Sequence, residues 1–219
     1  MSNIMFNDIY EMTPADNVLY FPNNIDVRIC PKNGMSSVKE ALRRSLASRA
    51  PLGLVDRVLS VKKHADQFDI PFRKGSYRIA IRRDPIDRFK SACEFIQSAR
   101  AFYIKNGRDL PDISLQIDRV IDDMERGLVK NSHFYTQSWY MGHPDDYDMV
   151  YHISEIPKLL DFLQEACTIE RDISGLHENR TTMKLYNDAI SPEHLVKLRN
   201  FYLKDYKNGW CKQEDRLPV

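Results

Sequence analysis

Long apolar runs are missing from the sequence, and none approaches the roughly 18 residues that a membrane-spanning helix requires. The first residues, MSNIMFNDIYEM, lack the basic and then apolar segments of a signal peptide. Neither charge sign is in excess, because 32 lysines and arginines are matched by 31 aspartates and glutamates. A net charge of +1 argues against a protein that coats nucleic acid. We therefore expect a cytoplasmic protein of bacterial or phage type.

Cysteine is scarce, and its four residues lie far apart without forming a CxxC pair. This spacing favours reduced thiols over a disulfide framework or a structural zinc site. The six histidines form neither an HExxH nor an HxH motif, so no metal site is expected.

Hydrophobic residues make up 42% of the 219 residues, which suffices for a sizeable core in one domain. The polar, turn-rich residues 1–24 are expected to form an irregular lead-in. Strand patterns occupy residues 27–30, 57–61, 77–81 and 148–152. Helical patterns occupy residues 36–48, 84–96, 113–128, 155–165 and 191–202. This alternation predicts an α/β fold with a mainly parallel central sheet flanked by helices.

The turn after the first expected strand has the composition of an anion-binding loop. It reads CPKNGMSS over residues 30–37 and leads directly into a helix. Helix N-termini offer unpaired N–H groups and the positive end of the helix dipole, so anions bind there. Gly34 allows a close backbone approach, and Lys32 adds a positive charge. Ser36 and Ser37 offer hydroxyl groups, although an ordinary turn with a serine cap is the alternative interpretation.

A second turn has the same layout. The strand at 77–81 is followed by Arg83, by Asp84 as a helix N-cap and by Pro85 at the first helical position. Arg88 and Ser91 share a helical face with Asp84. A guanidinium and a hydroxyl at a strand end suit a second phosphate, while a capped helix with a salt-bridged arginine is the alternative.

Taken together, the two turns resemble those of sulfotransferases that use 3′-phosphoadenosine 5′-phosphosulfate (PAPS), in particular the carbohydrate sulfotransferases and their bacterial relatives. CPKNGMSS fits the family's PK-x-G-x-[ST]-[ST] loop, which holds the 5′-phosphosulfate. RDPIDRFKS, at residues 83–91, matches the R-[DN]-P-x-x-R-x-x-S element, which holds the 3′-phosphate. The resemblance implies a P-loop-like three-layer fold.

Further segments extend the resemblance over roughly residues 26–210. His64-Ala65-Asp66 is similar to the HAD stretch of heparan sulfate 6-O-sulfotransferases, which implies that His64 is the base. NSHFYTQ, at residues 131–137, is similar to an H-[WF]-x-x-Q segment, and it makes His133 a second candidate for the base or an acceptor-binding group. Residues 147–155, 177–182 and 201–210 are similar to later landmarks of the family.

The two loop motifs and the resemblance to sulfotransferases together give each candidate residue an expected role. The expected nucleotide-binding residues are Lys32, Asn33, Gly34, Met35, Ser36, Ser37, Arg83, Ser91, Asn179 and Thr181. The expected acceptor-binding residues are His133, Gln137 and Trp139. Trp139 belongs to an aromatic stretch with Phe134, Tyr135 and Tyr140, of which at least two are expected in the core.

The expected reaction is transfer of a sulfuryl group from PAPS to a hydroxyl, with a carbohydrate as the favoured acceptor and a small metabolite as another. Lys32 would stabilise the charge that develops on the leaving phosphate. Two alternatives remain. A kinase-like phosphotransferase is disfavoured because Lys32 precedes Gly34, unlike the lysine of GxxxxGK[ST]. A non-catalytic nucleic-acid-binding module would use the basic residues Arg43, Arg44, Arg49, Lys62 and Lys63.

Overall fold

The computed structural model describes residues 18–47, 72–105, 117–129, 131–169, 173, 176 and 190–211. The first half of this range contains β1 (Val18–Phe21), β2 (Ile25–Ile29), α2 (Met35–Ala47), β3 (Tyr77–Arg82), α4 (Pro85–Lys105) and α5 (Ile117–Glu125). The second half contains α6 (Gln137–Met141), β4 (Met149–His152), α7 (Ile156–Ala166), α8 (Pro192–Phe201) and α9 (Leu203–Lys207). Three short 3-10 helices are η3 (Ser132–Phe134), η4 (Pro144–Asp146) and η5 (Ile153–Glu155).

The four strands form one sheet in the order β1-β2-β3-β4. β2 pairs with β3, and β3 with β4, in parallel, whereas β1 is antiparallel to β2. The expected α/β fold with a mainly parallel sheet is thus confirmed. Because Ile29 pairs with Ile81, the loops that follow β2 and β3 leave the sheet at the same edge.

The prediction of an irregular lead-in over residues 1–24 is wrong at its end, because residues 18–21 form β1. The sequence Val-Leu-Tyr-Phe suits a strand, and three residues connect it to β2 as a hairpin. Asn23 and Asn24 both have positive φ angles, of 56° and 60°. Asparagine tolerates this conformation better than most residues. The turn-forming residues that suggested an irregular segment therefore form the short connection between two strands.

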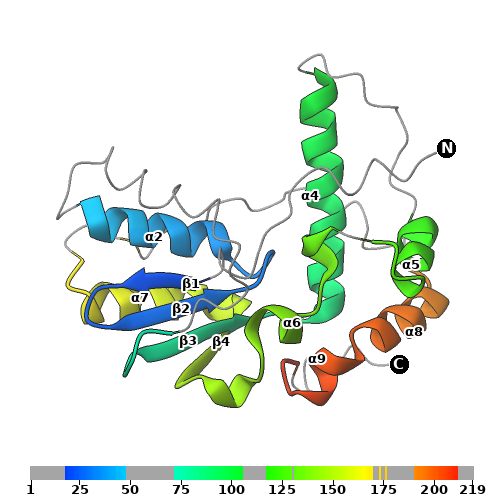
Figure 1. Cartoon of the computed structure of the whole chain (residues 1–219). Coiled ribbons are helices and arrows are strands. Elements are labelled where there is room, and N and C mark those ends of the chain that lie inside the picture. The colour runs from blue at the N-terminus through cyan, green and yellow to red at the C-terminus, as the bar shows by residue number, and fades with distance from the viewer. Residues whose placement is uncertain are drawn as a thin grey trace.

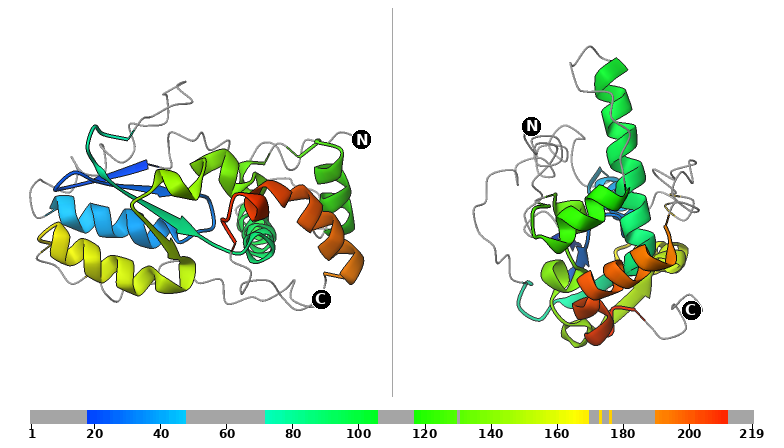
Figure 2. Two further views of the ribbon diagram at one scale, coloured as in Figure 1. Left: turned by 90° about the horizontal axis from the view of Figure 1, so that it is seen from below. Right: turned by 90° about the vertical axis from the view of Figure 1, so that its right-hand side faces the viewer.

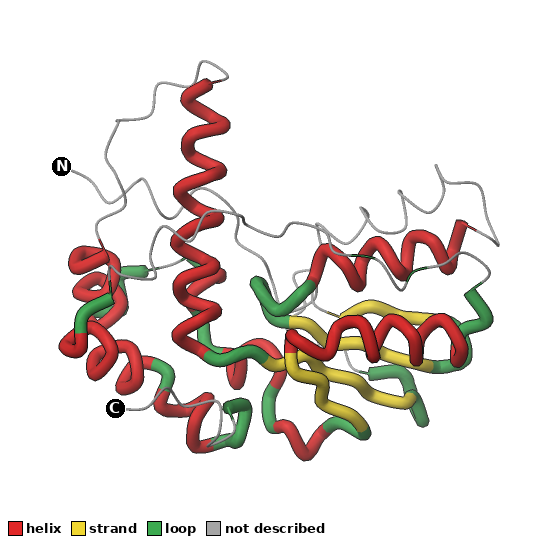
Figure 3. Tube along the Cα trace, turned by 180° about the vertical axis from the view of Figure 1, so that it is seen from behind, coloured by secondary structure: helices red, strands yellow, loops and turns green. Residues whose placement is uncertain are grey.

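Helices cover one face of the sheet. α2 and α7 lie side by side over one face, as Figures 1, 2 and 3 show from three directions. The alternation of the strands turns Val27, Ile29, Ile79 and Ile81 towards these helices, and all four are fully buried. On the opposite face, a second cluster of buried residues comprises Cys30, Ala80, Tyr140, Met141, Tyr147 and Trp210.

α4 stands at the end of β3, beside the sheet (Figure 1). It begins where expected, since the Asp84 carboxylate accepts hydrogen bonds from the N–H groups of Ile86 and Asp87 at 2.8 and 3.0 Å. α4, α5 and α8 share a third hydrophobic cluster. It includes the predicted stripe of Ile86, Phe89, Cys93 and Ile96, together with Leu198 and Tyr202.

Other boundaries agree in part with the sequence patterns. α8 begins as expected, with Ser191 as N-cap and Pro192 in the first turn. The helix expected over 113–128 is described as α5, which ends at Glu125. Leu128, expected on its buried face, is 43% exposed, because the chain turns at Gly127 with a φ of 66°. The expected strand at 57–61 lies outside the described residues.

All four cysteines are free and buried. In the part of the chain that the structure describes, no helix combines the length and apolar character needed to cross a membrane.

Candidate functional site

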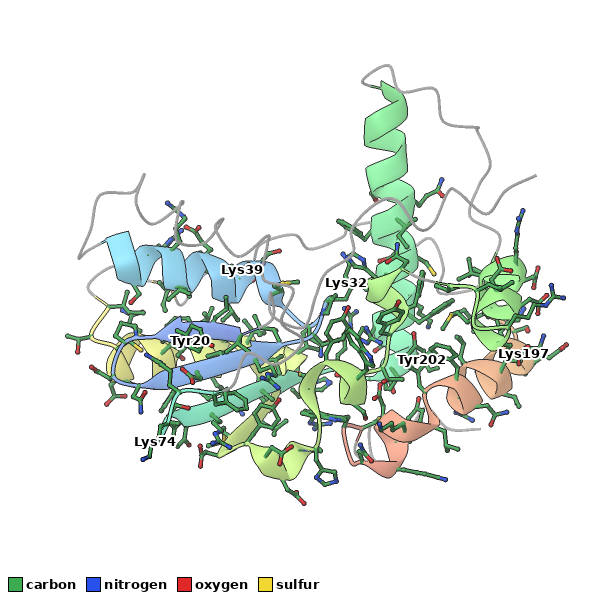
Figure 4. The ribbon with its side chains drawn as sticks, in the orientation of Figure 1. Tyr20, Lys32, Lys39, Lys74, Lys197 and Tyr202 are labelled. Atoms are coloured by element: carbon green, nitrogen blue, oxygen red, sulfur yellow. The ribbon has the colours of Figure 1, made fainter. Side chains whose placement is uncertain are left out.

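The two predicted anion loops meet at the edge where β2 and β3 end. The Arg83 guanidinium reaches across and donates a hydrogen bond from Nη1 to the backbone carbonyl of Lys32 at 2.9 Å. Figure 4 shows Lys32 at the end of β2, between α2 and α4. Residues 51 positions apart in sequence are therefore in direct contact at one strand edge.

The backbone of the first loop is held in an uncommon conformation. Lys32 and Gly34 have φ angles of 70° and 79°, both in the left-handed region. This conformation suits glycine and is rare for lysine. Space also limits position 34, because a Cβ there would lie 2.8 Å from Cδ1 of Ile156. The loop turns tightly and starts α2 at Met35, with Ser36 and Ser37 in its first turn.

The Lys32 ammonium group lies 3.5 Å from the centroid of the Phe95 ring. Within the described residues it has no hydrogen-bond acceptor and no ion pair. Burial and then the positive charge of Arg83 lower the pKa of Lys32 to about 7, against a smaller opposing effect of Glu94. Two cations held together in this way favour a bound anion.

Ser91 precedes Glu94 by three residues and Phe95 by four, so it neighbours both side chains on the surface of α4. Ser91 is half-buried. Burial raises the pKa of Glu94, while Arg83 and Lys32 oppose this effect. α4 therefore presents one hydroxyl and one carboxyl on the side that meets the two loops.

Gln137 ties the two loops together. Its side-chain oxygen accepts from the Arg83 backbone N–H at 3.0 Å and from Asn33 Nδ2 at 2.7 Å. Its amide nitrogen donates to the Arg83 carbonyl at 2.8 Å. Asn33 Nδ2 also donates to the carbonyl of Ile81 at 2.7 Å, which fixes the first loop to β3.

This network changes the roles expected for two residues. Gln137 was expected to bind the acceptor and Asn33 the nucleotide, yet both side chains are completely buried. Both side chains hold the two loops together, and their predicted binding roles stay predictions. Asn33 Oδ1 is a buried atom without a hydrogen-bond partner in the described part of the chain.

Asp205 fixes the segment that holds Gln137. Its carboxylate is fully buried and accepts from the backbone N–H groups of Gln137 and Ser138 at 2.8 and 2.7 Å. A carboxylate at this place caps the start of α6 and complements its dipole. The sequence patterns gave no indication of this contact.

Arg88 also has a different role from the one expected. It was placed on a helical face with Asp84 and Ser91, with a salt bridge as the alternative. In the structure it is fully buried and donates to the backbone carbonyls of His133, at 2.9 Å, and Tyr135. Arg88 thus anchors the segment around η3 against α4.

His133 lies next to this cluster. Its ring stacks on Phe95, with 4.9 Å between centroids and 25° between planes. Nδ1 lies 2.9 Å from Oδ1 of Asn131. Burial, followed by the charges of Lys32 and Arg88, lowers the pKa of His133 to about 3. The imidazole is therefore neutral throughout the physiological pH range.

The aromatic stretch divides as expected. Phe134 and Tyr140 are buried, whereas Trp139 is 43% exposed. The Trp139 ring makes edge-to-face contacts with Tyr135 and Tyr140, with centroids 4.9 and 4.8 Å away. An exposed ring held by two neighbours is a suitable surface for a sugar ring.

The remaining predicted site residues, His64, Asn179 and Thr181, lie outside the described residues. Among the residues described, no group of three or more His, Cys, Asp or Glu side chains is placed to hold a metal ion.

Comparison of the chain with protein-family models, with curated proteins and with solved structures found no match. The resemblance to sulfotransferases therefore depends on the short motifs described above.

Proposed function

We propose that this protein is a PAPS-dependent sulfotransferase that acts on a hydroxyl acceptor, with a carbohydrate as the favoured class. The observation that carries the proposal is the pairing of Lys32 and Arg83. Their side chains are largely buried and lie close enough for the charge of Arg83 to lower the pKa of Lys32. Within the described residues, Glu94 is the one acidic group that acts on both cations, so a polyanionic ligand would relieve their repulsion.

The arrangement suits in-line transfer. The acceptor oxygen would attack sulfur while the bond to the 5′-phosphate breaks, and negative charge would collect on the leaving phosphate. Lys32 and the N–H groups at the start of α2 are the groups that would stabilise this charge. A single such donor is worth about 3 kcal/mol in known sites. Arg83 and Ser91 would bind the 3′-phosphate.

The two alternatives receive less support. Lys32 stands before Gly34, which departs from the loop of nucleotide triphosphate-binding proteins. Of the basic residues that a nucleic-acid-binding module would use, Arg43 and Arg44 both form ion pairs with Glu40, at 2.5 and 2.9 Å. Their charge is thus partly neutralised within α2.

A cytoplasmic location belongs to this proposal, and four free cysteines fit a reducing compartment.

His64 and His133 are the two candidates for the base that takes the acceptor's proton. Trp139 would contribute to acceptor binding through its exposed ring.

The experiment that tests the proposal has two arms. Thermal shift measurements with adenosine 3′,5′-bisphosphate (PAP), ATP and AMP should show the largest stabilisation with PAP. Incubation with PAPS and pooled sugars or small alcohols should then add the mass of one SO₃ group to a product.

Lys32→Ala should remove most of this turnover and leave the fold intact. Lys74→Ala is the matched control, because Lys74 is exposed and lies at the opposite end of the sheet (Figure 4). Stabilisation by ATP but not by PAP would instead favour the phosphotransferase. A Lys32→Ala variant with the wild-type rate would refute the assignment of the loop.

A further inference from the structure

The backbone and the ammonium group of Lys32 are both held in place. Arg83 donates from Nη1 to the Lys32 carbonyl at 2.9 Å, and Asn33 ties the next residue to the carbonyl of Ile81 at 2.7 Å. The Lys32 ammonium lies on the Phe95 ring, 3.5 Å from its centroid. Lys32 is half-buried, so the residue is not sealed from solvent. Its amine therefore has a defined position that a small molecule can approach.

The contacts of this amine differ from those of other lysines in the structure. Lys158 donates to Glu155 at 3.2 Å, and Lys197 donates to Asp122 at 3.0 Å. The Lys32 ammonium has no such acceptor among the described residues and faces an aromatic ring instead. A lysine without a carboxylate partner loses its proton more readily, and its electron pair can then attack an electrophile.

The groups around Lys32 favour the uncharged amine. Burial and then the charge of Arg83 lower the pKa of Lys32 to about 7, and Glu94 on α4 opposes them with a smaller effect. Burial lowers the pKa of His133, next to the site, to about 3, so its ring is neutral at pH 7. About half of the Lys32 amines are therefore uncharged at pH 7, whereas an ordinary lysine is uncharged in fewer than about one in a thousand molecules.

Donors for a phosphate lie beside this amine. A guanidinium has five N–H groups, and Arg83 uses one of them on the Lys32 carbonyl. The others have no acceptor among the described residues. The N–H groups at the start of α2, a helix of 13 residues, follow the same loop. A phosphate bound by these donors is placed next to the amine.

We propose that Lys32 is a site of covalent acylation and that the reactant is a small acyl phosphate, with acetyl phosphate as the probe. The phosphate binds Arg83 and the start of α2, which brings the acyl carbon to the amine. The product is a neutral acyl-lysine, so one of the two cations of the site is lost and nucleotide binding is switched off. This inference depends on the placement of Lys32 and Arg83 and goes beyond the proposed sulfotransferase function.

The reaction needs no further reactant. The electron pair of Lys32 Nζ attacks the carbonyl carbon of the acyl phosphate, and an amide C–N bond forms. The C–O bond to the phosphate breaks, and its electron pair leaves on inorganic phosphate. The amine loses one proton, which the phosphate takes up, and no oxidation or reduction occurs. Arg83 stabilises the charge of the leaving phosphate.

The first test treats the purified wild-type protein with acetyl phosphate. Peptide mass spectrometry should show Lys32 acetylated on the order of 10- to 100-fold faster than Lys74. Lys74 is the internal control, because it is exposed at the opposite end of the sheet (Figure 4). The rate at Lys32 should saturate with acetyl phosphate and fall when inorganic phosphate competes, whereas the rate at Lys74 should do neither. Equal rates at the two lysines would overturn the proposal.

The second test separates phosphate binding from the reactivity of the amine. p-Nitrophenyl acetate carries the same acyl group without a phosphate, so its preference for Lys32 over Lys74 should be smaller. Arg83→Ala should slow the reaction of Lys32 with acetyl phosphate by about tenfold or more. Arg119→Ala is the matched control, because this arginine is exposed on α5. An equal preference for Lys32 with both reagents would overturn the role of the phosphate.

The third test measures the consequence for nucleotide binding. Acetylated wild-type protein should bind PAP about tenfold more weakly or worse. Lys32→Arg cannot form the acyl-lysine, so the same treatment should leave its PAP affinity unchanged. An equal loss in Lys32→Arg would assign the effect to other lysines and overturn the proposed switch.

The outcomes distinguish this proposal from the sulfotransferase function. Selective acetylation of Lys32 in a protein that binds no PAP would support acylation and overturn the sulfotransferase function. PAP binding without selective acetylation of Lys32 would overturn only the acylation.

Discussion

Gln137 pairs with the backbone of Arg83 through both ends of its side-chain amide. It accepts from the Arg83 N–H at 3.0 Å and donates to the Arg83 carbonyl at 2.8 Å. These two hydrogen bonds are the ones that a residue of a neighbouring strand would form with Arg83 if β3 continued by one residue. The direction in which Arg83 leaves the sheet therefore depends on a residue 54 positions later.

Replacing Gln137 by alanine should destabilise the protein and weaken PAP binding together. The change removes the partners of the Arg83 backbone N–H and carbonyl and one of the two hydrogen bonds of Asn33 Nδ2. A buried group left without a partner costs roughly 1–3 kcal/mol. Urea denaturation and PAP titration would measure the two effects. Gln164→Ala is the matched control. Gln164 belongs to α7, and its side-chain oxygen accepts a hydrogen bond from the backbone N–H of Ile173, away from the loops. Equal loss of PAP affinity in both variants would contradict this account.

The affinity for PAP should decrease as the pH rises above 7. The pKa of Lys32 is lowered to about 7 in the free protein, so the ammonium loses its proton above that pH and attracts the phosphates less. Binding restores the charge, and PAP should therefore bind with uptake of a proton near pH 8, with affinity falling up to about tenfold per pH unit. Calorimetry in buffers of different ionisation enthalpy would measure the uptake.

Lys32→Arg provides the control for this pH dependence. Arginine stays charged at every accessible pH. The affinity of the variant for PAP should therefore stay constant between pH 7 and 9, which is roughly the range in which Lys32 titrates. A Lys32→Arg variant with the wild-type slope would assign the titration to another group.

Lys32→Met should raise the thermal stability while it removes PAP binding. The folded protein holds this lysine with a lowered pKa, so a charged Lys32 opposes folding. The penalty is complete below pH 7 and declines as the pH rises towards the unfolded value of about 10.4. The gain in Tm should accordingly be larger at pH 6 than at pH 9. Lys74→Met, at an exposed position, should show no such gain.

Arg83→Ala and Ser91→Ala should reduce the preference for PAP over AMP, which lacks the 3′-phosphate. A hydrogen bond to a charged group contributes about 1.5–3 kcal/mol, so Arg83→Ala should reduce this preference by roughly 10- to 100-fold. Competition binding would measure it. Arg119→Ala is the control, because this arginine is exposed on α5. Full retention of the preference in Arg83→Ala would place the 3′-phosphate elsewhere.

The sequence predicted those features that depend on neighbouring residues. Lys32 and Arg83 each follow a strand and precede a helix, and the parallel pairing of β2 and β3 then brings them together. The Asp84 cap was also predictable, since its partners are two and three residues away.

The remaining features depend on distant residues. An isolated Gln137 could bond to any polar group, and its partner Asn33 lies 104 positions earlier. Arg88 was predicted only to share a helical face with Asp84 and Ser91, because its burial against the η3 segment leaves no trace in its own helix. Leu128 fitted the apolar period of α5, and only the turn at Gly127 removes it from the core.

The cap that Asp205 places on α6 also bears on how the protein matures during synthesis. Both loops leave the ribosome long before Asp205, which lies 68 residues after Gln137. Until that carboxylate arrives, the N–H groups at the start of α6 lack their acceptor, and Gln137 is not yet oriented towards Asn33 and Arg83. Contacts between such distant residues form late and slowly. A nascent chain should therefore gain its affinity for the nucleotide in a single late step, well after its sheet has paired.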